Sequence, residues 1–149
     1  MRSQLWLTWA GIRWVLLMLL LAPSLGSPAA TRPEAEPKPL RVWLGLASWY
    51  GPGFQGRLTA AGELYNMYAA TAAHPTLPLG TIVRLVNPAN GRARIVRIND
   101  RGPYIEGREI DVSYEVARWL GFDERGLARV RIELLEVPRR PWTATPAAD

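Results

Sequence analysis

The segment from Asn99 to Tyr104 joins a carboxylate to a sharp turn of the chain. Asp100 follows a β-branched, strand-like run at 92–98 and precedes the Gly102-Pro103 break. A carboxylate held at the end of a strand can serve as a general acid or base. Aspartate also caps turns by accepting hydrogen bonds from nearby backbone N–H groups, and this segment alone favours that simpler role.

The residue inventory excludes several kinds of catalysis. The chain has no cysteine and one histidine, His74, which excludes a thiol nucleophile and a zinc site built on two or three histidines. No Gly-Lys-Ser/Thr phosphate loop or dinucleotide fingerprint is present. A triad of Ser48, His74 and Asp100 stays formally open, although no Gly-x-Ser-x-Gly elbow supports it. The chemistry that remains is that of carboxylates, the groups that commonly cleave glycosidic bonds. We expect no cofactor and no metal.

Three further residues could contribute to such a site. Glu63 lies in a Gly-containing loop at 59–63, and Asp111 precedes the first residues of a predicted helix. Taken singly, an acidic residue is more often solvated or a cap than catalytic. A lone histidine such as His74 is likewise more often packed and hydrogen-bonded than catalytic.

The elements that must position these residues are mainly strands. Strands are predicted at 41–50, 82–86, 92–98 and 128–137, and Asn90-Gly91 predicts a hairpin between the second and third of them. One short helix is predicted at 114–120, with Ser113 as its N-cap and Gly121 as its stop. The pattern predicts a mainly β protein, a small barrel of short strands with one helix.

The composition divides the chain into four segments. Residues 1–26 resemble an export signal, with Arg2 and Arg13 flanking an apolar run; an uncleaved anchor is the alternative. Residues 27–40 form a proline-rich spacer that we expect to be disordered, 41–138 form the barrel, and 139–149 a flexible tail. We therefore expect an exported protein, periplasmic or associated with the cell wall. It would carry no lipid anchor, because there is no cysteine to acylate.

The charge of the chain is mildly basic. The formal net charge is +5, and loss of residues 1–26 would leave 16 basic against 13 acidic residues. The basic residues are scattered and form no run, so we expect no nucleic-acid partner. We also expect the protein to be monomeric.

Six ordered segments carry a resemblance to a known family. They include Asn99-Asp100-Arg101-Gly102-Pro103, and together they lie at 47–51, 56–63, 71–74, 77–81, 99–103 and 107–113. In this order they resemble the rare lipoprotein A family of bacterial peptidoglycan lytic transglycosylases, over roughly residues 45–137. The resemblance implies a six-stranded double-psi β-barrel with one short helix.

The resemblance also assigns roles to residues. It implies that Asp100 is the catalytic acid and base, that Glu63 and His74 line the same groove, and that Asp111 is structural or orients the substrate. Glycan binding falls to a set of mostly aromatic and polar residues, namely Trp49, Tyr50, Gln55, Arg101, Tyr104 and Asp111. Tyr65 and Tyr68 could also stack on sugar rings.

The implied reaction is non-hydrolytic cleavage of the MurNAc–GlcNAc β-1,4 bond of peptidoglycan, which leaves 1,6-anhydro ends. Three departures from the family pattern stand out: Gln55 replaces a histidine, the lipid-bearing cysteine is missing, and no glycan-binding repeat follows Val137. Two other functions remain open. The barrel could bind glycan without cutting it, as expansin-like domains do, or Glu63 and Asp100 could act as the carboxylate pair of a hydrolase.

Overall fold

The computed structural model describes residues 36–140, which form six strands and one α-helix. The strands are β1 (Arg41–Trp49), β2 (Thr71–Ala73), β3 (Ile82–Val86), β4 (Ala93–Asp100), β5 (Ile110–Val112) and β6 (Leu127–Glu136), and the helix is α1 (Tyr114–Leu120). The predicted export signal, residues 27–35 of the spacer and residues 141–149 of the tail lie outside the described residues. Within residues 36–140, no helix is long and apolar enough to cross a membrane.

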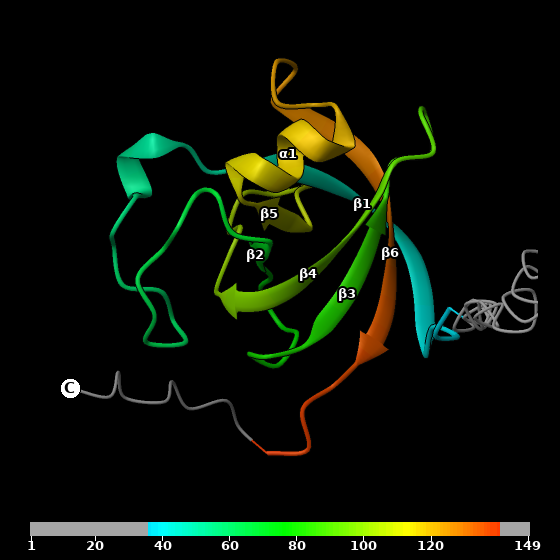
Figure 1. Ribbon diagram of the computed structural model, residues 1–149, viewed down its shortest axis with the longest axis horizontal. Helices are drawn as coiled ribbons and strands as arrows, with labels where there is room; N and C mark the ends of the chain where they lie inside the picture. The colour runs from blue at the N-terminus through cyan, green and yellow to red at the C-terminus, as the bar shows by residue number, and fades with distance from the viewer. Residues whose placement is uncertain (1–35, 141–149) are drawn as a thin grey trace, which may run out of the picture. The chain divides into compact units, whose positions relative to one another are not determined.

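The strands close into one barrel in the order β1-β5-β2-β4-β3-β6 (Figure 1). The pairs β1–β5 and β2–β4 are parallel, and the other four pairs are antiparallel. Alternate residues of the strands fill the interior, because successive side chains of a strand point to opposite faces. Together with apolar side chains of α1 they form one core, which includes Val83, Leu85, Val96, Ile98, Ile110, Val112, Val116, Leu120, Val130 and Ile132. The expected six-stranded barrel with one helix is confirmed.

Local sequence signals explain the hairpin and the helix. Gly91 turns the chain between β3 and β4 with a φ of 71°, a conformation that glycine adopts without strain. Ser113 caps α1 by accepting a hydrogen bond from the N–H of Val116, and Gly121 ends the helix in the left-handed conformation. The predicted bounds of β3 and α1 agree with the structure.

Two strands, β2 and β5, have no counterpart in the sequence prediction. Each has three residues, and all of them except Asp111 are buried. A three-residue strand is too short to show the alternation that identifies a half-buried strand.

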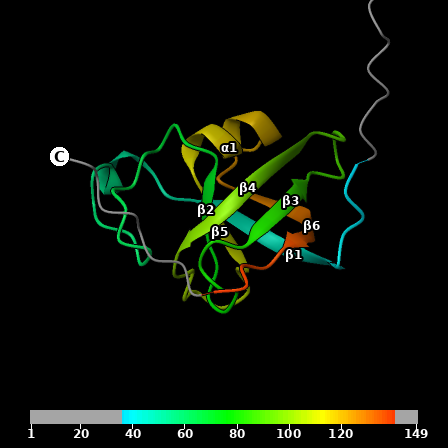
Figure 2. The ribbon, with the colours of Figure 1, turned by 60° about the horizontal axis from the view of Figure 1, so that its bottom comes forward.

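The topology brings several loops to the same end of the barrel. Because β2 and β4 are parallel, both strands end there, and Ala73 pairs with Asp100. The long connection between β1 and β2 projects beyond the end of β4 in both Figure 1 and Figure 2. This end of the barrel therefore collects Asp100, His74 and the loop that carries Glu63.

Candidate active site

Asp100 is the last residue of β4 and lies where the barrel interior opens. It follows Val96 and Ile98, whose side chains fill the core, and the register of β4 against β2 shifts between Ile98 and Asp100. Its Oδ1 accepts two backbone hydrogen bonds, from the N–H of Ala60 at 2.9 Å and from that of Arg101 at 2.8 Å. Its Oδ2 accepts no hydrogen bond from the described residues. The carboxyl group is thus held in one orientation with one oxygen available.

Asp100 lines a pocket of about 240 Å³ between the barrel and the loops that follow β1. The ring of Tyr50 packs against Tyr65 with centroids 4.3 Å apart and against Phe54 at 5.9 Å. These rings give the pocket an aromatic wall beside the carboxylate. The complete lining is Tyr50, Phe54, Arg57, Leu58, Tyr65 and Asp100.

The two tyrosines of the wall are held in the neutral form. Burial raises the pKa of Tyr50. The neighbouring Tyr65 and the negative charges of Asp100 and Asp111 raise this pKa further, whereas a hydrogen bond with the Thr71 hydroxyl lowers it. Burial raises the pKa of Tyr65 to about 12, and its hydroxyl donates a 3.0 Å hydrogen bond to the carbonyl of Tyr50. Both phenols therefore stay protonated over the physiological pH range.

Glu63 forms a two-pronged ion pair with Arg97 of β4. Nη1 and Nη2 of Arg97 lie 2.7 Å and 2.8 Å from the two carboxylate oxygens. The side-chain amide of Asn99 donates a further bond of 3.3 Å to Oε2. Both oxygens of Glu63 are thus occupied by donors from the strand that ends at Asp100.

His74 is buried, with 4% of its surface exposed. Its Nδ1 accepts the backbone N–H groups of Thr76 at 3.2 Å and Leu77 at 3.0 Å. The proton of the neutral ring therefore lies on Nε2, which is 3.8 Å from Oε1 of Glu109. Burial lowers the pKa of His74; the charge of Glu109 opposes this and that of Arg101 adds to it.

Arg101 points its guanidinium to the same loop. Its Nη1 donates to the carbonyl oxygens of His74 at 3.3 Å and of Leu77 at 2.8 Å. The N–H of His74 in turn donates to the carbonyl of Asp100 at 3.2 Å. The segment at 74–77, which lies beside Asp100, is thus held both by the ring of His74 and by the guanidinium of Arg101.

The remaining predicted site residues lie in different surroundings. Asp111 accepts a hydrogen bond from the hydroxyl of Ser48 on the neighbouring strand β1. Because Ser48 donates to Asp111 and Nδ1 of His74 accepts backbone groups, the formal triad of Ser48, His74 and Asp100 does not form. Oε1 of Gln55 accepts the N–H of Met67 at 2.8 Å.

Two aromatic residues of the predicted set differ in their packing. The indole N–H of Trp49 donates to the carbonyl of Asp123 at 3.0 Å, and its ring packs against Tyr114 with centroids 5.3 Å apart. Tyr104 is 81% exposed. Of the predicted residues, Asp100, Tyr50 and Tyr65 line the 240 Å³ pocket. Glu63 and His74 instead contact the segments that support it.

Sequence reasoning missed four residues of this site. Phe54, Arg57 and Leu58 line the pocket, and Arg97 holds Glu63. Arg97 and Asn99 are two residues apart on β4, so the alternation of the strand places both on one face. The spacing of Arg97 and Asn99 could therefore have identified Arg97 from the sequence. Phe54, Arg57 and Leu58 lie in loops, where no periodic pattern indicates which side chains face a pocket.

Comparisons with known proteins identify relatives of the barrel. Residues 44–132 match the model of the protein family described as lytic transglycolase. The chain is 50% identical over 99 residues to "Endolytic peptidoglycan transglycosylase RlpA" of Vibrio cholerae, covering 65% of this chain and 38% of the relative. It is 53% identical over 99 residues to the protein of the same name of Pseudomonas aeruginosa, covering 66% of this chain and 29% of the relative. The chain thus spans less than half the length of these relatives.

Solved structures with the same fold are more distant in sequence. The Streptomyces papain inhibitor aligns with a TM-score of 0.54 at 20% identity, over 66% of this chain and 97% of that protein. An expansin of Clavibacter michiganensis aligns with a TM-score of 0.53 at 22% identity, over 68% of this chain and 54% of the expansin. These likenesses and the family model confirm the expected double-psi β-barrel. The chain belongs to the lytic transglycolase family, and its resemblance to the rare lipoprotein A proteins is confirmed.

Proposed function

We propose that this protein is an endolytic lytic transglycosylase that cleaves the MurNAc–GlcNAc β-1,4 bond of peptidoglycan. The observation that carries the proposal is the orientation of Asp100 at the aromatic pocket. Two N–H donors hold Oδ1, so a proton on this carboxyl group resides on Oδ2. The names of the relatives, about half identical to this chain over the barrel, support the same activity.

In the first step, Asp100 acts as a general acid. Its Oδ2 gives a proton to the glycosidic oxygen as the bond from that oxygen to C1 of the MurNAc residue breaks. The GlcNAc part leaves with a free 4-hydroxyl group, and C1 gains oxocarbenium character. In the uncharged aromatic wall, Phe54 is 48% exposed and offers a ring face on which a sugar can stack, and Tyr50 and Tyr65 pack behind it.

In the second step, the same carboxylate acts as a general base. It takes the proton of the C6 hydroxyl of the MurNAc residue while O6 forms a bond to C1. The product carries a 1,6-anhydro ring, Asp100 regains its proton, and no water is consumed.

The environment of Glu63 favours this reaction over hydrolysis by a carboxylate pair. A nucleophilic or basic carboxylate needs a free oxygen directed at the sugar or at a water molecule. Both oxygens of Glu63 are instead engaged by Arg97. We therefore assign Glu63 and His74 to positioning: Glu63 orients β4 before Asp100, and His74 orients the loop beside it.

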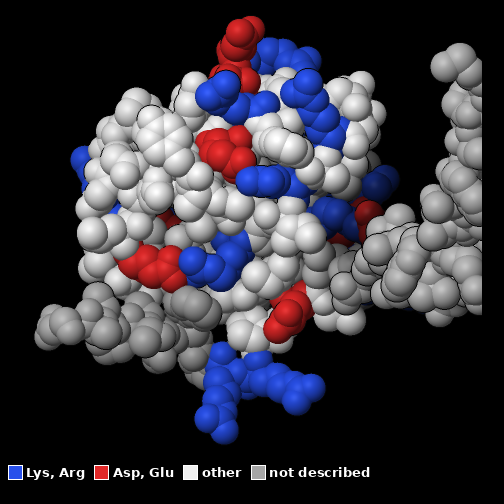
Figure 3. All heavy atoms as spheres, viewed as in Figure 1, with Lys and Arg blue, Asp and Glu red and all other residues white. Residues whose placement is uncertain are grey.

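We further propose that the protein is exported, that it acts as a monomer in the periplasm or at the cell wall, and that it carries no lipid anchor. The apolar run within residues 1–26 supports export, and the absence of cysteine supports the lack of a lipid anchor. Figure 3 shows basic and acidic side chains interspersed on one described face of the barrel, a surface without the continuous basic area that nucleic acids favour.

Mass spectrometry of the products released from purified glycan strands tests the proposed reaction. We expect fragments with 1,6-anhydro ends, which lack one water relative to hydrolysis products. Reducing ends would instead support a hydrolase, and intact strands retained by the protein would support a glycan-binding module. Either of these two results would overturn the proposal.

A further inference from the structure

The ring of His74 can hold the segment at 74–77 only while the ring is neutral. Its Nδ1 accepts the backbone N–H groups of Thr76 and Leu77. Because Nε2 already carries a proton, a second proton would go to Nδ1 and remove this acceptor. The N–H of His74 donates to the carbonyl of Asp100 at 3.2 Å, so a change in this segment reaches the residue that carries the proposed reaction.

The other ring nitrogen of His74 faces a carboxylate. Nε2 is buried and has no hydrogen-bond partner among the described residues, and Oε1 of Glu109 lies 3.8 Å from it. At this separation the carboxylate attracts the N–H dipole without forming a hydrogen bond. The ring of Trp43 lies at 85° to the imidazole, with centroids 6.5 Å apart. Glu109 is therefore the acidic group placed to orient Nε2–H.

Contacts with β1 fix the position of Glu109. The indole N–H of Trp43 donates to the same Oε1 at 3.0 Å, and the backbone N–H of Glu109 donates to the carbonyl of Leu46 at 2.9 Å. A Cβ at Gly45 would lie 2.8 Å from the Cβ of Glu109, so only a glycine permits this close approach. The carboxylate is thus held in one place beside His74.

We propose that Glu109 is a positioning residue of the active site, which holds the ring of His74 in the orientation that the segment beside Asp100 requires. This inference rests on the proposed function, in which Asp100 transfers the proton. Glu109 attracts Nε2–H, and Nδ1 is then directed at the N–H groups of Thr76 and Leu77. Glu109 does not line the pocket of Asp100, so it acts through His74 and not on the glycan.

The charge of Glu109 also affects the pH range in which His74 stays neutral. Within residues 36–140, the charged groups that act on His74 are Glu109 from the segment before β5 and Arg101 from the segment after β4. Burial lowers the pKa of His74, the charge of Glu109 raises it and that of Arg101 lowers it. Loss of the negative charge of Glu109 should therefore move the protonation of His74 to lower pH. Because the protonated ring loses its acceptor, kcat should fall as the pH decreases through the pKa of His74.

Two substitutions separate the charge of Glu109 from its oxygen. Glu109→Gln keeps a side-chain oxygen for Trp43 and for Nε2 of His74 but removes the charge. We expect this variant to have a kcat near that of the wild type at pH 7.5, and a fall in kcat that begins at lower pH. Glu109→Ala removes the oxygen as well. It should lower kcat about tenfold with an unchanged KM, since a misplacement of about 1 Å can cost about 10²-fold.

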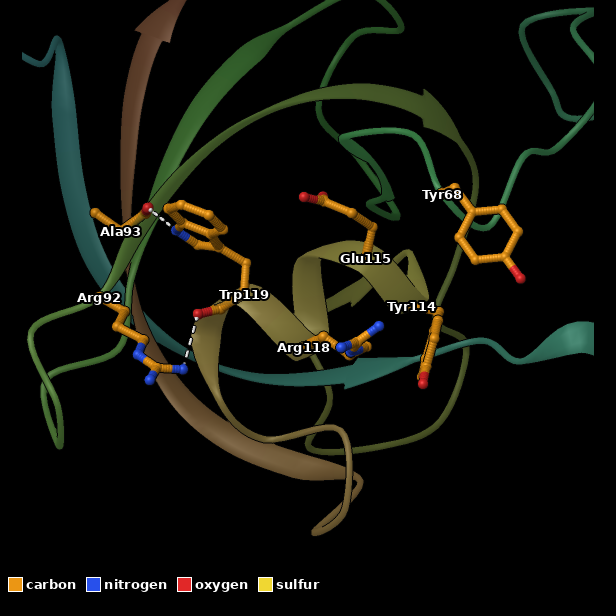
Figure 4. Close-up of a pocket in the computed structure, with 7 residues that line it drawn as sticks. All are labelled: Tyr68, Arg92, Ala93, Tyr114, Glu115, Arg118 and Trp119. Carbon is orange, nitrogen blue, oxygen red and sulfur yellow. Dashed lines mark hydrogen bonds between the residues drawn. The ribbon is translucent and has the colours of Figure 1, made fainter.

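Glu115 is the matched control in another part of the protein. It lines a pocket of about 640 Å³ beside α1 (Figure 4) and pairs with Arg94 at 2.6 Å. The other residues that line this pocket are Tyr68, Arg92, Ala93, Tyr114, Arg118 and Trp119. Glu115→Gln and Glu115→Ala make the same chemical changes at a carboxylate away from His74. We expect both to leave kcat, KM and the titration of His74 unchanged, even where the lost ion pair lowers stability.

The ring of His74 can be followed directly by NMR of the full chain, because it is the only histidine. The pH titration of its ring signals gives its pKa. Amide exchange at Thr76 and Leu77 reports whether their hydrogen bonds to Nδ1 persist. We expect Glu109→Gln to titrate at lower pH than the wild type. Glu109→Ala should speed the exchange of both amides, whereas Glu115→Ala should leave their exchange unchanged.

Three results would overturn the inference. They are a titration of His74 that does not move to lower pH in Glu109→Gln, unchanged exchange at Thr76 and Leu77 in Glu109→Ala, and equal losses of kcat in Glu109→Ala and Glu115→Ala. Failure of the proposed function is read separately, from the products that the wild type releases from glycan strands. The NMR measurements need no substrate, so they test the link between Glu109 and His74 even in a protein without lytic activity. An active protein in which the Glu109 variants leave these signals unchanged would reject the positioning role alone.

Discussion

The backbone N–H of Ala60 donates a 2.9 Å hydrogen bond to Oδ1 of Asp100. The next residue, Ala61, donates its N–H to the carbonyl of Asn99 at 3.0 Å. The loop at 59–63 is therefore tied to both the side chain and the backbone at the end of β4. Its conformation sets the direction in which the carboxyl group of Asp100 points.

Asp100→Asn should abolish glycan cleavage and leave the fold intact. The amide oxygen can still accept the N–H groups of Ala60 and Arg101, but the amide nitrogen cannot donate and recover the proton that both steps need. Loss of a general acid and base costs about 10²–10⁴ in rate. The rate of anhydro-product release measures the loss, and thermal unfolding checks the fold.

Asp123→Asn is the matched control for this prediction. It makes the same chemical change at a partly exposed aspartate whose backbone carbonyl, not its side chain, contacts Trp49. We expect normal turnover from this variant. Wild-type turnover from Asp100→Asn would show that Asp100 only caps a turn.

Gly62→Ala should lower activity by disturbing the loop that holds Asp100. Gly62 has a φ of 79°, which is unfavourable for alanine by about 1–2 kcal/mol. Relief of this strain would move the adjacent N–H donors at Ala60 and Ala61. We expect a loss of stability of about 1 kcal/mol in thermal or denaturant unfolding together with a clear fall in kcat.

Gly91→Ala separates strain from catalysis. Gly91 has a φ of 71° in the β3–β4 hairpin, and an added Cβ would meet no atom within 4 Å. It should lose similar stability while keeping its kcat. If both variants lose activity alike, the effect comes from general destabilisation and not from the loop at Asp100.

Short-range signals account for the parts of the fold that the sequence predicts well. Asn90-Gly91 determines the β3–β4 turn, and Ser113 and Gly121 determine the ends of α1, because each acts on neighbouring backbone groups. The strands β2 and β5 depend instead on closure of the barrel. Their three residues pair with strands distant in the sequence, and no local pattern encodes those pairs.

The same distinction applies to the site. Asp100 could be placed because it follows the strand-like run of β4 and stands directly before the turn at Gly102-Pro103. The pairing of Glu63 with Arg97 joins residues 34 positions apart, and only the folded loop brings them together. The sequence suggested Glu63 as a groove residue, whereas its contacts lie along β4.

The pairing of Glu63 with Arg97 should show as coupling in a double-mutant cycle. Glu63→Gln, Arg97→Gln and the double variant are compared by denaturant unfolding. The pair is about one quarter exposed, so we expect a coupling energy of about 1–2 kcal/mol, between the values for surface and buried pairs. Glu63→Gln should also retain part of the activity, because Asp100 remains to transfer the proton.

Two results would contradict this assignment. Additive stability effects would show that the two-pronged contact contributes little to the fold. Complete inactivity of Glu63→Gln in a stably folded protein would move Glu63 from positioning to a direct role in catalysis.

His74→Gln should weaken the pH dependence of stability below neutrality. Burial lowers the pKa of His74 in the folded protein below the unfolded value of 6.5. Between these two pKa values, the imidazole is therefore protonated in the unfolded chain but neutral in the folded protein. The free energy of unfolding of the wild type should therefore fall as the pH decreases through 6.5 toward the lowered pKa. Between pH 7.5 and 5.5 this amounts to at most about 1.4 kcal/mol.

Glutamine suits this test because its side-chain oxygen can still accept the N–H groups of Thr76 and Leu77 without titrating. His74 is the only histidine of the chain, so no second imidazole titrates in this range. Thermal unfolding of both proteins from pH 5.5 to 7.5 gives the comparison, and we expect the flatter profile from His74→Gln. Parallel profiles would show that the proton affinity of His74 is the same in the folded and unfolded chain, and that burial does not keep its ring neutral.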